Sequence, residues 1–156
     1  MFSCFVETEL GLFGASGDEW GLSRIYLPHE AQEAANRPSE GPLPWDFPGQ
    51  LMEYLAGKRK EWNLPFSLTG SPFQLAVWYA CKDIPYGSAC TYGQLAAMAG
   101  YSGAAQSVGR AMAANPLPLV IPCHRVLPAS GGIGCYGGGA DLKEKLLRLE
   151  GVLETE

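Results

Sequence analysis

The sequence predicts an α+β protein with two parts. Residues 1–68 are expected to form a small N-terminal domain built on an antiparallel sheet, and residues 69–156 a mainly helical C-terminal domain with a winged helix-turn-helix-like motif. Short β-prone runs separated by turn formers fill residues 2–27, whereas apolar residues recur at helical spacing from Ser71 onward. This change of period places the domain boundary close to Ser71.

The first domain is expected to begin with three short strands, at Phe2–Val6, Gly11–Gly14 and Leu22–Leu27, with Ser16-Gly17-Asp18 among the turn formers between them. A polar helix, a proline-rich connection, a second helix and an extended segment should follow. They are expected at residues 29–36, 37–48, 49–56 and 58–70.

The second domain is expected to begin with three helices. Ser71 followed by proline is typical of a helix N-terminus, and Ile84-Pro85-Tyr86-Gly87 ends that helix. Thr91 should cap a second helix that Gly100 closes, and a third should run from about residue 104 to 114. Two short helices joined by a glycine-containing turn are a helix-turn-helix candidate, although most such pairs are ordinary core.

The composition narrows the class of protein. No apolar stretch approaches the ~20 residues that span a bilayer, and the N-terminus lacks a secretory signal, so a cytoplasmic protein without membrane contact is expected. The five cysteines form no CxxC pair and His29 has no neighbouring ligands, so neither disulfides nor a metal site are predicted. The net charge of −5 arises within residues 1–62, which carry five basic and ten acidic side chains; residues 63–156 carry six of each and can still meet nucleic acid.

The segment Pro122-Cys123-His124-Arg125-Val126 sets a thiol beside an imidazole and a guanidinium. A free cysteine, with a pKa of about 8.5, is mostly protonated at neutral pH, whereas neighbouring cations favour the thiolate. Cys123 is therefore the candidate nucleophile. The helix expected over residues 104–114 is rich in alanine and glycine, which suits either tight helix packing or close approach to a narrow groove.

A series of short motifs occurs in order over residues 69–151. They are Ile84-Pro85-Tyr86-Gly87, Thr91-Tyr92-Gly93-Gln94-Leu95-Ala96, Val108-Gly109-Arg110-Ala111-Met112, Asn115-Pro116, Pro122-Cys123-His124-Arg125-Val126, Tyr136-Gly137-Gly138-Gly139, Lys143 and Leu146-Leu147-Arg148-Leu149-Glu150-Gly151. Together they resemble the methylated-DNA--protein-cysteine methyltransferases, also called O6-alkylguanine-DNA alkyltransferases. The first domain resembles the family's variable N-terminal domain more loosely.

The resemblance implies direct-reversal DNA repair. A methyl or larger alkyl group on O6 of guanine, and also on O4 of thymine, would pass from double-stranded DNA to Cys123 of this S-methyltransferase. Because the lesion lies inside the duplex, the nucleotide must be flipped out into a pocket. The product is a thioether that resists hydrolysis, so each molecule would act once. No cofactor is expected, and the protein is expected to be a monomer.

The resemblance also assigns catalytic roles. His124 would take the Cys123 proton through a water molecule, and Glu150 would orient that imidazole; the alternative for Glu150 is a solvated helix end. Asn115 would brace the turn that joins the recognition helix to the Cys123 segment. Tyr92 would donate to N3 of the leaving guanine.

The other assignments concern the substrate and the DNA. The substrate-binding residues it implies are Tyr136, Val126, Met112, Gly137, Gly138 and Lys143. The DNA-binding residues it implies are Gln106, Arg110, Ala105, Tyr92 and Ser71. Two positions depart from the family pattern: Gly137, where many relatives carry serine, and Gln106, where an arginine usually fills the gap left by the flipped base. The glutamine predicts weaker binding to DNA.

Some alternatives stay open. One alternative is a DNA-binding protein that senses alkylguanine without repairing it, although the presence of Cys123 argues against this. The other is a hydrolytic enzyme that uses a cysteine nucleophile. Arg125 either ties the Cys123 loop to neighbouring groups, which is favoured, or contacts phosphate. The remaining cysteines, including Cys135 close to the expected pocket, are interpreted as small incidental side chains.

Overall fold

The computed structural model describes residues 1–154 and divides the chain into two compact units, Met1–Leu68 and Thr69–Glu156. The first unit contains an antiparallel sheet and two helices, and the second is mainly helical. The predicted α+β fold class is therefore confirmed. Among the helices of residues 1–154, none is both long and apolar enough to cross a membrane.

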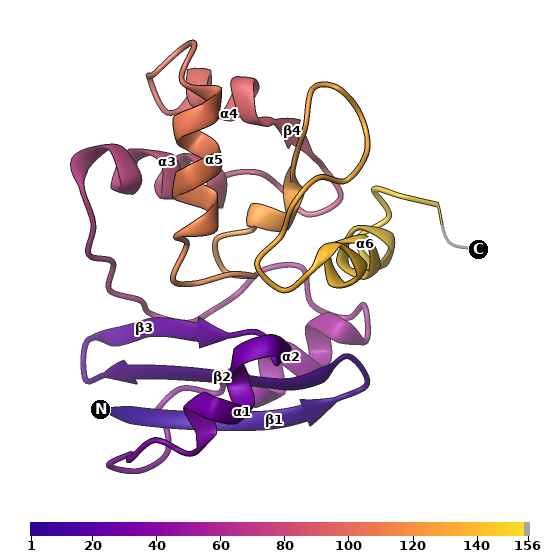
Figure 1. The fold of residues 1–156 in the computed structure, drawn as a ribbon. Coiled ribbons are helices and arrows are strands. Elements are labelled where there is room, and N and C mark those ends of the chain that lie inside the picture. Colours follow the sequence, from indigo (N-terminus) through magenta and orange to yellow (C-terminus); the bar gives the residue numbers. More distant parts are fainter. Residues whose placement is uncertain (155–156) are drawn as a thin grey trace. The chain divides into compact units, whose positions relative to one another are not determined.

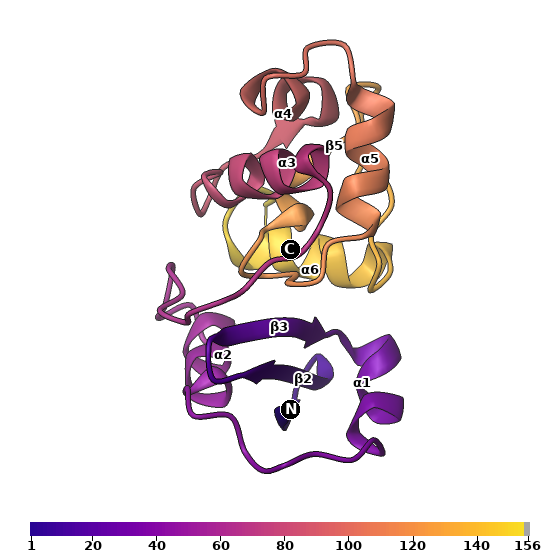
Figure 2. The ribbon, with the colours of Figure 1, turned by 90° about the vertical axis from the view of Figure 1, so that its left-hand side faces the viewer.

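The sheet of the first unit has the order β1-β2-β3, with both pairs antiparallel (Figure 1). Its central strand is buried almost throughout, because α1 and α2 lie on opposite sides of the sheet (Figure 2). The elements of this unit are β1 (Phe2–Thr8), β2 (Gly11–Asp18), β3 (Gly21–Tyr26), α1 (Pro28–Ala35) and α2 (Phe47–Leu55).

Several boundaries in this unit differ by one or more residues from the sequence prediction, and those of β2 and α2 have a local physical reason. The turn expected at Ser16-Gly17-Asp18 is wrong, because these residues continue β2 and the chain reverses only after Asp18. The register of the β2–β3 pair shifts at a bulge between Ser16 and Gly17. Position 17 needs glycine, because a Cβ atom there would lie 2.3 Å from the Gly21 carbonyl oxygen. Helix α2 begins at Phe47 rather than residue 49, because the Asp46 carboxylate accepts a hydrogen bond from the Gly49 amide and caps it.

In the second unit, α3, α4 and α5 pack against one another, and α6 contacts the short helix η1 (Figure 2). The elements are α3 (Pro72–Lys82), β4 (Cys90–Thr91), α4 (Tyr92–Met98), α5 (Ala105–Ala113), η1 (Cys123–Arg125), β5 (Val126–Leu127) and α6 (Ala140–Leu149). The two-residue strands β4 and β5 pair in parallel. The predicted helix pair is thus present as α4 and α5, and Gly100 and Gly103 in the turn between them adopt positive φ angles of 89° and 86°.

Local sequence explains where α3 and α4 begin. The Ser71 hydroxyl accepts from the Gln74 amide, and the Gln74 side chain accepts from the Ser71 amide; Thr91 and Gln94 repeat this capping box at α4. Tertiary contact then fixes α5, because the buried Trp78 indole donates to the carbonyl of Ala111 at 2.8 Å. Helix α5 begins after Ala104 without a side-chain cap.

The Thr91 cap should be measurable in isolation. Replacing Thr91 with alanine removes the acceptor for the Gln94 amide and should lower the free energy of unfolding by about 1 kcal/mol. Thr91→Ser keeps a hydroxyl in the same place and should cost much less. Urea denaturation followed by circular dichroism compares the two variants, and equal losses would show that packing of the threonine methyl group, rather than the cap, stabilises the start of α4.

Candidate active site

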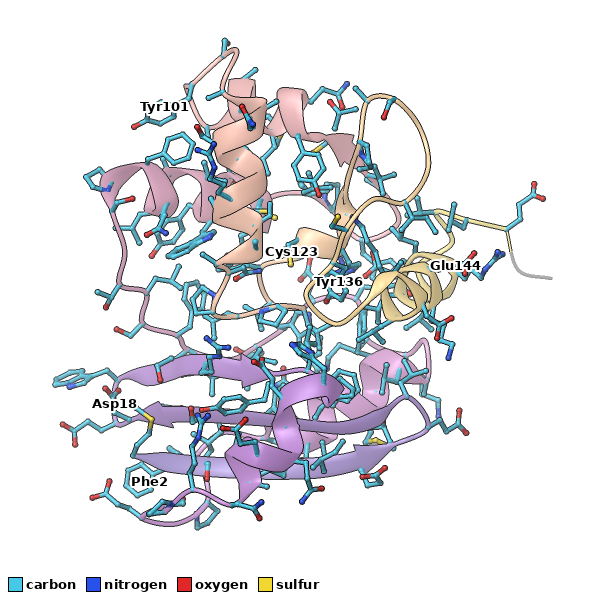
Figure 3. The ribbon with its side chains drawn as sticks, in the orientation of Figure 1. Phe2, Asp18, Tyr101, Cys123, Tyr136 and Glu144 are labelled. Atoms are coloured by element: carbon cyan, nitrogen blue, oxygen red, sulfur yellow. The ribbon has the colours of Figure 1, made fainter. Side chains whose placement is uncertain are left out.

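A cavity of about 220 Å³ opens beside Cys123 in the second unit. Its walls come from the start of α4, one face of α5, η1 and the loop that precedes α6. The lining residues are Tyr92, Gly109, Met112, Ala113, Cys123, Cys135, Tyr136 and Gly137. In Figure 3, Cys123 and Tyr136 lie next to each other, one from η1 and the other from the loop.

A tight turn after α5 positions Cys123. The Asn115 side chain accepts from the Leu117 amide and donates to the Ile121 carbonyl, both at 2.9 Å, so it closes the turn from two sides. Buried Leu119 at the tip has a φ of 78°, a left-handed conformation that costs energy for a branched residue and persists only where its surroundings hold it. The predicted bracing of this turn by Asn115 is the geometry found.

Cys123 is buried, and this burial dominates its ionisation. Desolvation raises the pKa of the thiol, while a hydrogen bond with Asn115 and the positive charge of Lys143 partly lower it. The groups that favour the thiolate are therefore Asn115, Lys143 and the backbone at Cys123 itself, and not the two neighbouring side chains along the chain, as the sequence suggested. Arg125 does not stabilise the thiolate because its guanidinium is bound to the Glu150 carboxylate, and His124 does not because its buried imidazole is neutral.

His124 is fully buried, with Nε2 at 2.8 Å from Oε2 of Glu150. Burial lowers the pKa of His124, and the hydrogen bond and charge of Glu150 oppose that shift. Because a carboxylate only accepts, Nε2 carries the proton and Nδ1 keeps its lone pair. Nδ1 makes no hydrogen bond with any described residue. The imidazole is therefore a base whose accepting nitrogen is not engaged by Glu150.

Arg125 forms the structural tie that the sequence favoured. Its Nε and Nη2 atoms donate to the two carboxylate oxygens of Glu150 at 2.7 and 2.9 Å, and Nη1 donates to the Ile84 carbonyl at 2.6 Å. Glu150 is fully buried, so the alternative of a solvated helix end is wrong. One carboxylate thus holds both side chains that follow Cys123.

Lys143 lies behind the cavity rather than in its wall. Its ammonium group is buried and donates to the carbonyls of Val126 at 2.7 Å and Cys135 at 3.2 Å. Burial lowers the pKa of Lys143, whereas the two thiols Cys123 and Cys135 raise it. Lys143 therefore fastens the loop over the cavity to β5 and places a positive charge near the nucleophile.

The structure brings most of the predicted site residues together. Tyr92, Met112, Tyr136 and Gly137 line the cavity with Cys123, while Val126, Gly138 and Lys143 are not among its lining residues. The Tyr136 hydroxyl is buried without a hydrogen-bond partner among the described residues, and burial raises the pKa of this phenol well above its usual value. Sequence reasoning did not assign Gly109 or Ala113 to the site, although small residues four apart on α5 were the available signal. It placed Cys135 close to the pocket but as an incidental side chain, whereas Cys135 lines the cavity.

The predicted DNA-binding residues lie at the ends or on the surface of helices. Gln106 and Arg110, one helical turn apart on α5, are both exposed, and Ala105 begins that helix. Ser71 is exposed at the start of α3, with its hydroxyl already accepting the capping hydrogen bond. Within residues 1–154, no three His, Cys, Asp or Glu side chains are grouped to hold a metal ion.

Comparison with known proteins agrees with this geometry. Residues 72–152 match the family model for the 6-O-methylguanine DNA methyltransferase DNA binding domain. A methylated-DNA--protein-cysteine methyltransferase of Mycolicibacterium paratuberculosis is 40% identical over 148 residues, covering 93% of this chain and 89% of that protein. A protein of the same name from Methanosarcina acetivorans is 35% identical over 159 residues, covering 97% and 99%.

A solved structure is similar over nearly the whole chain. Mycobacterium tuberculosis OGT in complex with DNA has a TM-score of 0.85 and 34% identity, covering 97% of this chain and 93% of that chain. The resemblance seen in the sequence motifs is thereby confirmed. The chain belongs to the 6-O-methylguanine DNA methyltransferase family.

Proposed function

We propose that this protein repairs DNA by transferring an alkyl group from O6 of guanine irreversibly to its own Cys123. The observation that carries the proposal is the placement of Cys123 in the wall of a small cavity, with the neutral His124 beside it and Glu150 behind. The cavity is smaller than the ~300–1,000 Å³ of most ligand sites, which suits one base swung out of a duplex. Family membership supports the same reaction.

The reaction needs one bond to form and one to break. The Cys123 thiol gives its proton through a water molecule to Nδ1 of His124, and Glu150 stabilises the resulting imidazolium. The sulfur then forms a bond to the alkyl carbon as the bond from that carbon to O6 breaks. The guanine leaves with a negative charge that Tyr92, in the cavity wall, neutralises by donating to N3. The thioether left on Cys123 has no hydrolysable bond, so the protein is consumed.

Helix α5 is the element that we propose contacts the DNA. Its small residues Gly109 and Ala113 line the cavity, while Gln106 and Arg110 are exposed on the same helix. A helix with such short side chains lets the DNA backbone come close, and Gln106 would occupy the gap left by the flipped base through hydrogen bonds. Double-stranded DNA carrying O6-alkylguanine, and also O4-alkylthymine, is the proposed substrate. We propose that a monomer acts without a cofactor.

Covalent transfer can be tested by intact mass measurement after incubation with O6-benzylguanine. One benzyl group should be added per protein, and digestion should place it on Cys123. Cys123→Ser should accept none, because a hydroxyl is a far weaker nucleophile than a thiolate. Cys90→Ser, which changes a half-buried cysteine outside the cavity wall, should still accept one. Absence of any adduct would favour the sensing alternative, and repeated release of product would favour hydrolysis.

The buried Glu150 should stabilise the second unit strongly. Glu150→Gln leaves the Arg125 guanidinium buried without a counter-charge and should lower the free energy of unfolding by about 3–5 kcal/mol. The matched control is Glu144→Gln on the same helix, whose ion pair with Arg148 is partly exposed and should be worth less than about 1 kcal/mol. Urea denaturation compares the two. Equal, small losses would contradict the central position of Glu150.

The Gln106 position can be tested through salt dependence. Gln106→Arg should tighten binding to a duplex, and if the new charge contacts phosphate the slope of log affinity against log salt should steepen by about 0.9. Gln106→Ala, which removes the amide without adding charge, should weaken binding and leave the slope unchanged. Fluorescence anisotropy over a salt series measures both quantities. If neither variant changes affinity, Gln106 is not at the DNA interface.

A further inference from the structure

Two thiols line the same cavity, and the proposed function uses only one of them. Cys123 is buried in the wall, whereas Cys135 is exposed on the loop that covers it. The Lys143 ammonium and the Tyr92 phenol are each within electrostatic reach of both sulfur atoms, and each thiolate raises the pKa of these two groups. Cys123 and Cys135 are therefore neighbours around a shared pair of side chains.

The loop that carries Cys135 is irregular and rich in glycine. Residues 128–139 contain no helix or strand, and Gly131, Gly132 and Gly134 adopt positive φ angles of 101°, 78° and 79°. The hydrogen bond from Lys143 to the Cys135 carbonyl anchors the backbone close to the cavity. A disulfide needs Cα atoms about 4.4–6.8 Å apart, and the glycines before Cys135 are the part of this site whose backbone has the most freedom to adjust to that spacing.

The other cysteines are less suited to pair with Cys123. Cys81 lies within electrostatic reach of Cys123, which raises its pKa, but it is fully buried on α3, where an oxidant in solution does not reach it. Cys90 lies in β4, whose backbone is held by its pairing with β5. Neither lines the cavity, so Cys135 is the partner that an oxidant in solution reaches beside the nucleophile.

We propose that Cys135 is a redox partner of Cys123, forming a reversible disulfide that closes the acceptor site when peroxides are present. A peroxide oxidises the exposed Cys135 thiol to a sulfenic acid and releases one water molecule. The Cys123 sulfur then attacks the Cys135 sulfur, and the sulfenic oxygen leaves as a second water molecule. The two thiols lose two electrons and two protons in total, and the peroxide is reduced.

The consequence follows from the chemistry of the two oxidised states. A disulfide is reopened by thiol reductants, whereas a cysteine oxidised to sulfinic acid is lost in most proteins. In a protein that acts once through Cys123, which is the proposed function on which this inference rests, the disulfide would suspend repair and preserve the nucleophile. Without Cys135 no disulfide would form, and the slower direct oxidation of the buried Cys123 by peroxide would end in irreversible products.

The test treats the full chain, Cys135→Ser and Cys90→Ser with hydrogen peroxide, followed by digestion without reduction and mass spectrometry. A peptide pair joined through Cys123 and Cys135 should appear in the full chain and in Cys90→Ser, and should be absent from Cys135→Ser. This readout does not depend on alkyl transfer. A link from Cys123 to Cys81 or Cys90, or no link at all, would overturn the proposal. Cys135→Ala repeats the test should the serine variant not fold.

The same peroxide-treated proteins are then incubated with O6-benzylguanine, and the fraction that accepts a benzyl group is measured. Each protein is compared with its own untreated sample, which separately tests the proposed function. Oxidised full-length protein should lose acceptance and recover most of it after dithiothreitol, whereas Cys135→Ser should recover several-fold less. Equal recovery in both proteins would show that Cys135 does not protect Cys123.

Discussion

The second unit depends on one buried carboxylate. Glu150 follows α6 and accepts hydrogen bonds from Arg125 and His124, the two residues that come directly after the nucleophile. Arg125 extends the connection to the Ile84 carbonyl beyond α3. The contact therefore joins three segments that are far apart in the sequence. Because an unpaired buried charge is costly, this arrangement specifies one conformation of η1 and one orientation of Cys123.

The nucleophile is held in an environment that opposes its own ionisation. Burial raises the pKa of Cys123, and a hydrogen bond with Asn115, the charge of Lys143 and a backbone hydrogen bond offset part of that effect. The thiol is thus protonated in the resting protein, which limits its reaction with random electrophiles. In the proposed mechanism His124 removes the proton only when a base fills the cavity and the alkyl carbon lies next to the sulfur. Leu119, in a left-handed conformation, lies in the turn that delivers Cys123, and such a conformation persists only where the surrounding structure holds it.

Helix α5 combines two roles through its small side chains. Gly109 and Ala113 form part of the cavity wall, and the exposed Gln106 and Arg110 belong to the same three turns of helix. The alanine-rich composition left open whether this helix was core or a groove-binding surface. In the structure Val108 and Ala111 are buried, while cavity-lining and exposed residues occupy the remaining faces, so one face is core and the groove-binding role of the exposed face is a proposal.

The sequence by itself determined whatever depends on neighbouring residues. Ser71 and Thr91 mark helix starts because their hydroxyls bond amides three positions ahead, and the segment around Cys123 identified the nucleophile. Only the tertiary structure decided how distant side chains act around that nucleophile. Lys143 of α6 lowers the pKa of the Cys123 thiol, whereas Glu150, which follows α6, acts on the neighbouring His124 through a hydrogen bond. The continuation of β2 through Ser16-Gly17-Asp18 was likewise decided by pairing with β3. Burial and long-range contacts set the pKa of Cys123, the pairing of Arg125 with Glu150 and the place of Cys135 in the same cavity as Cys123. No local sequence pattern encodes these three features.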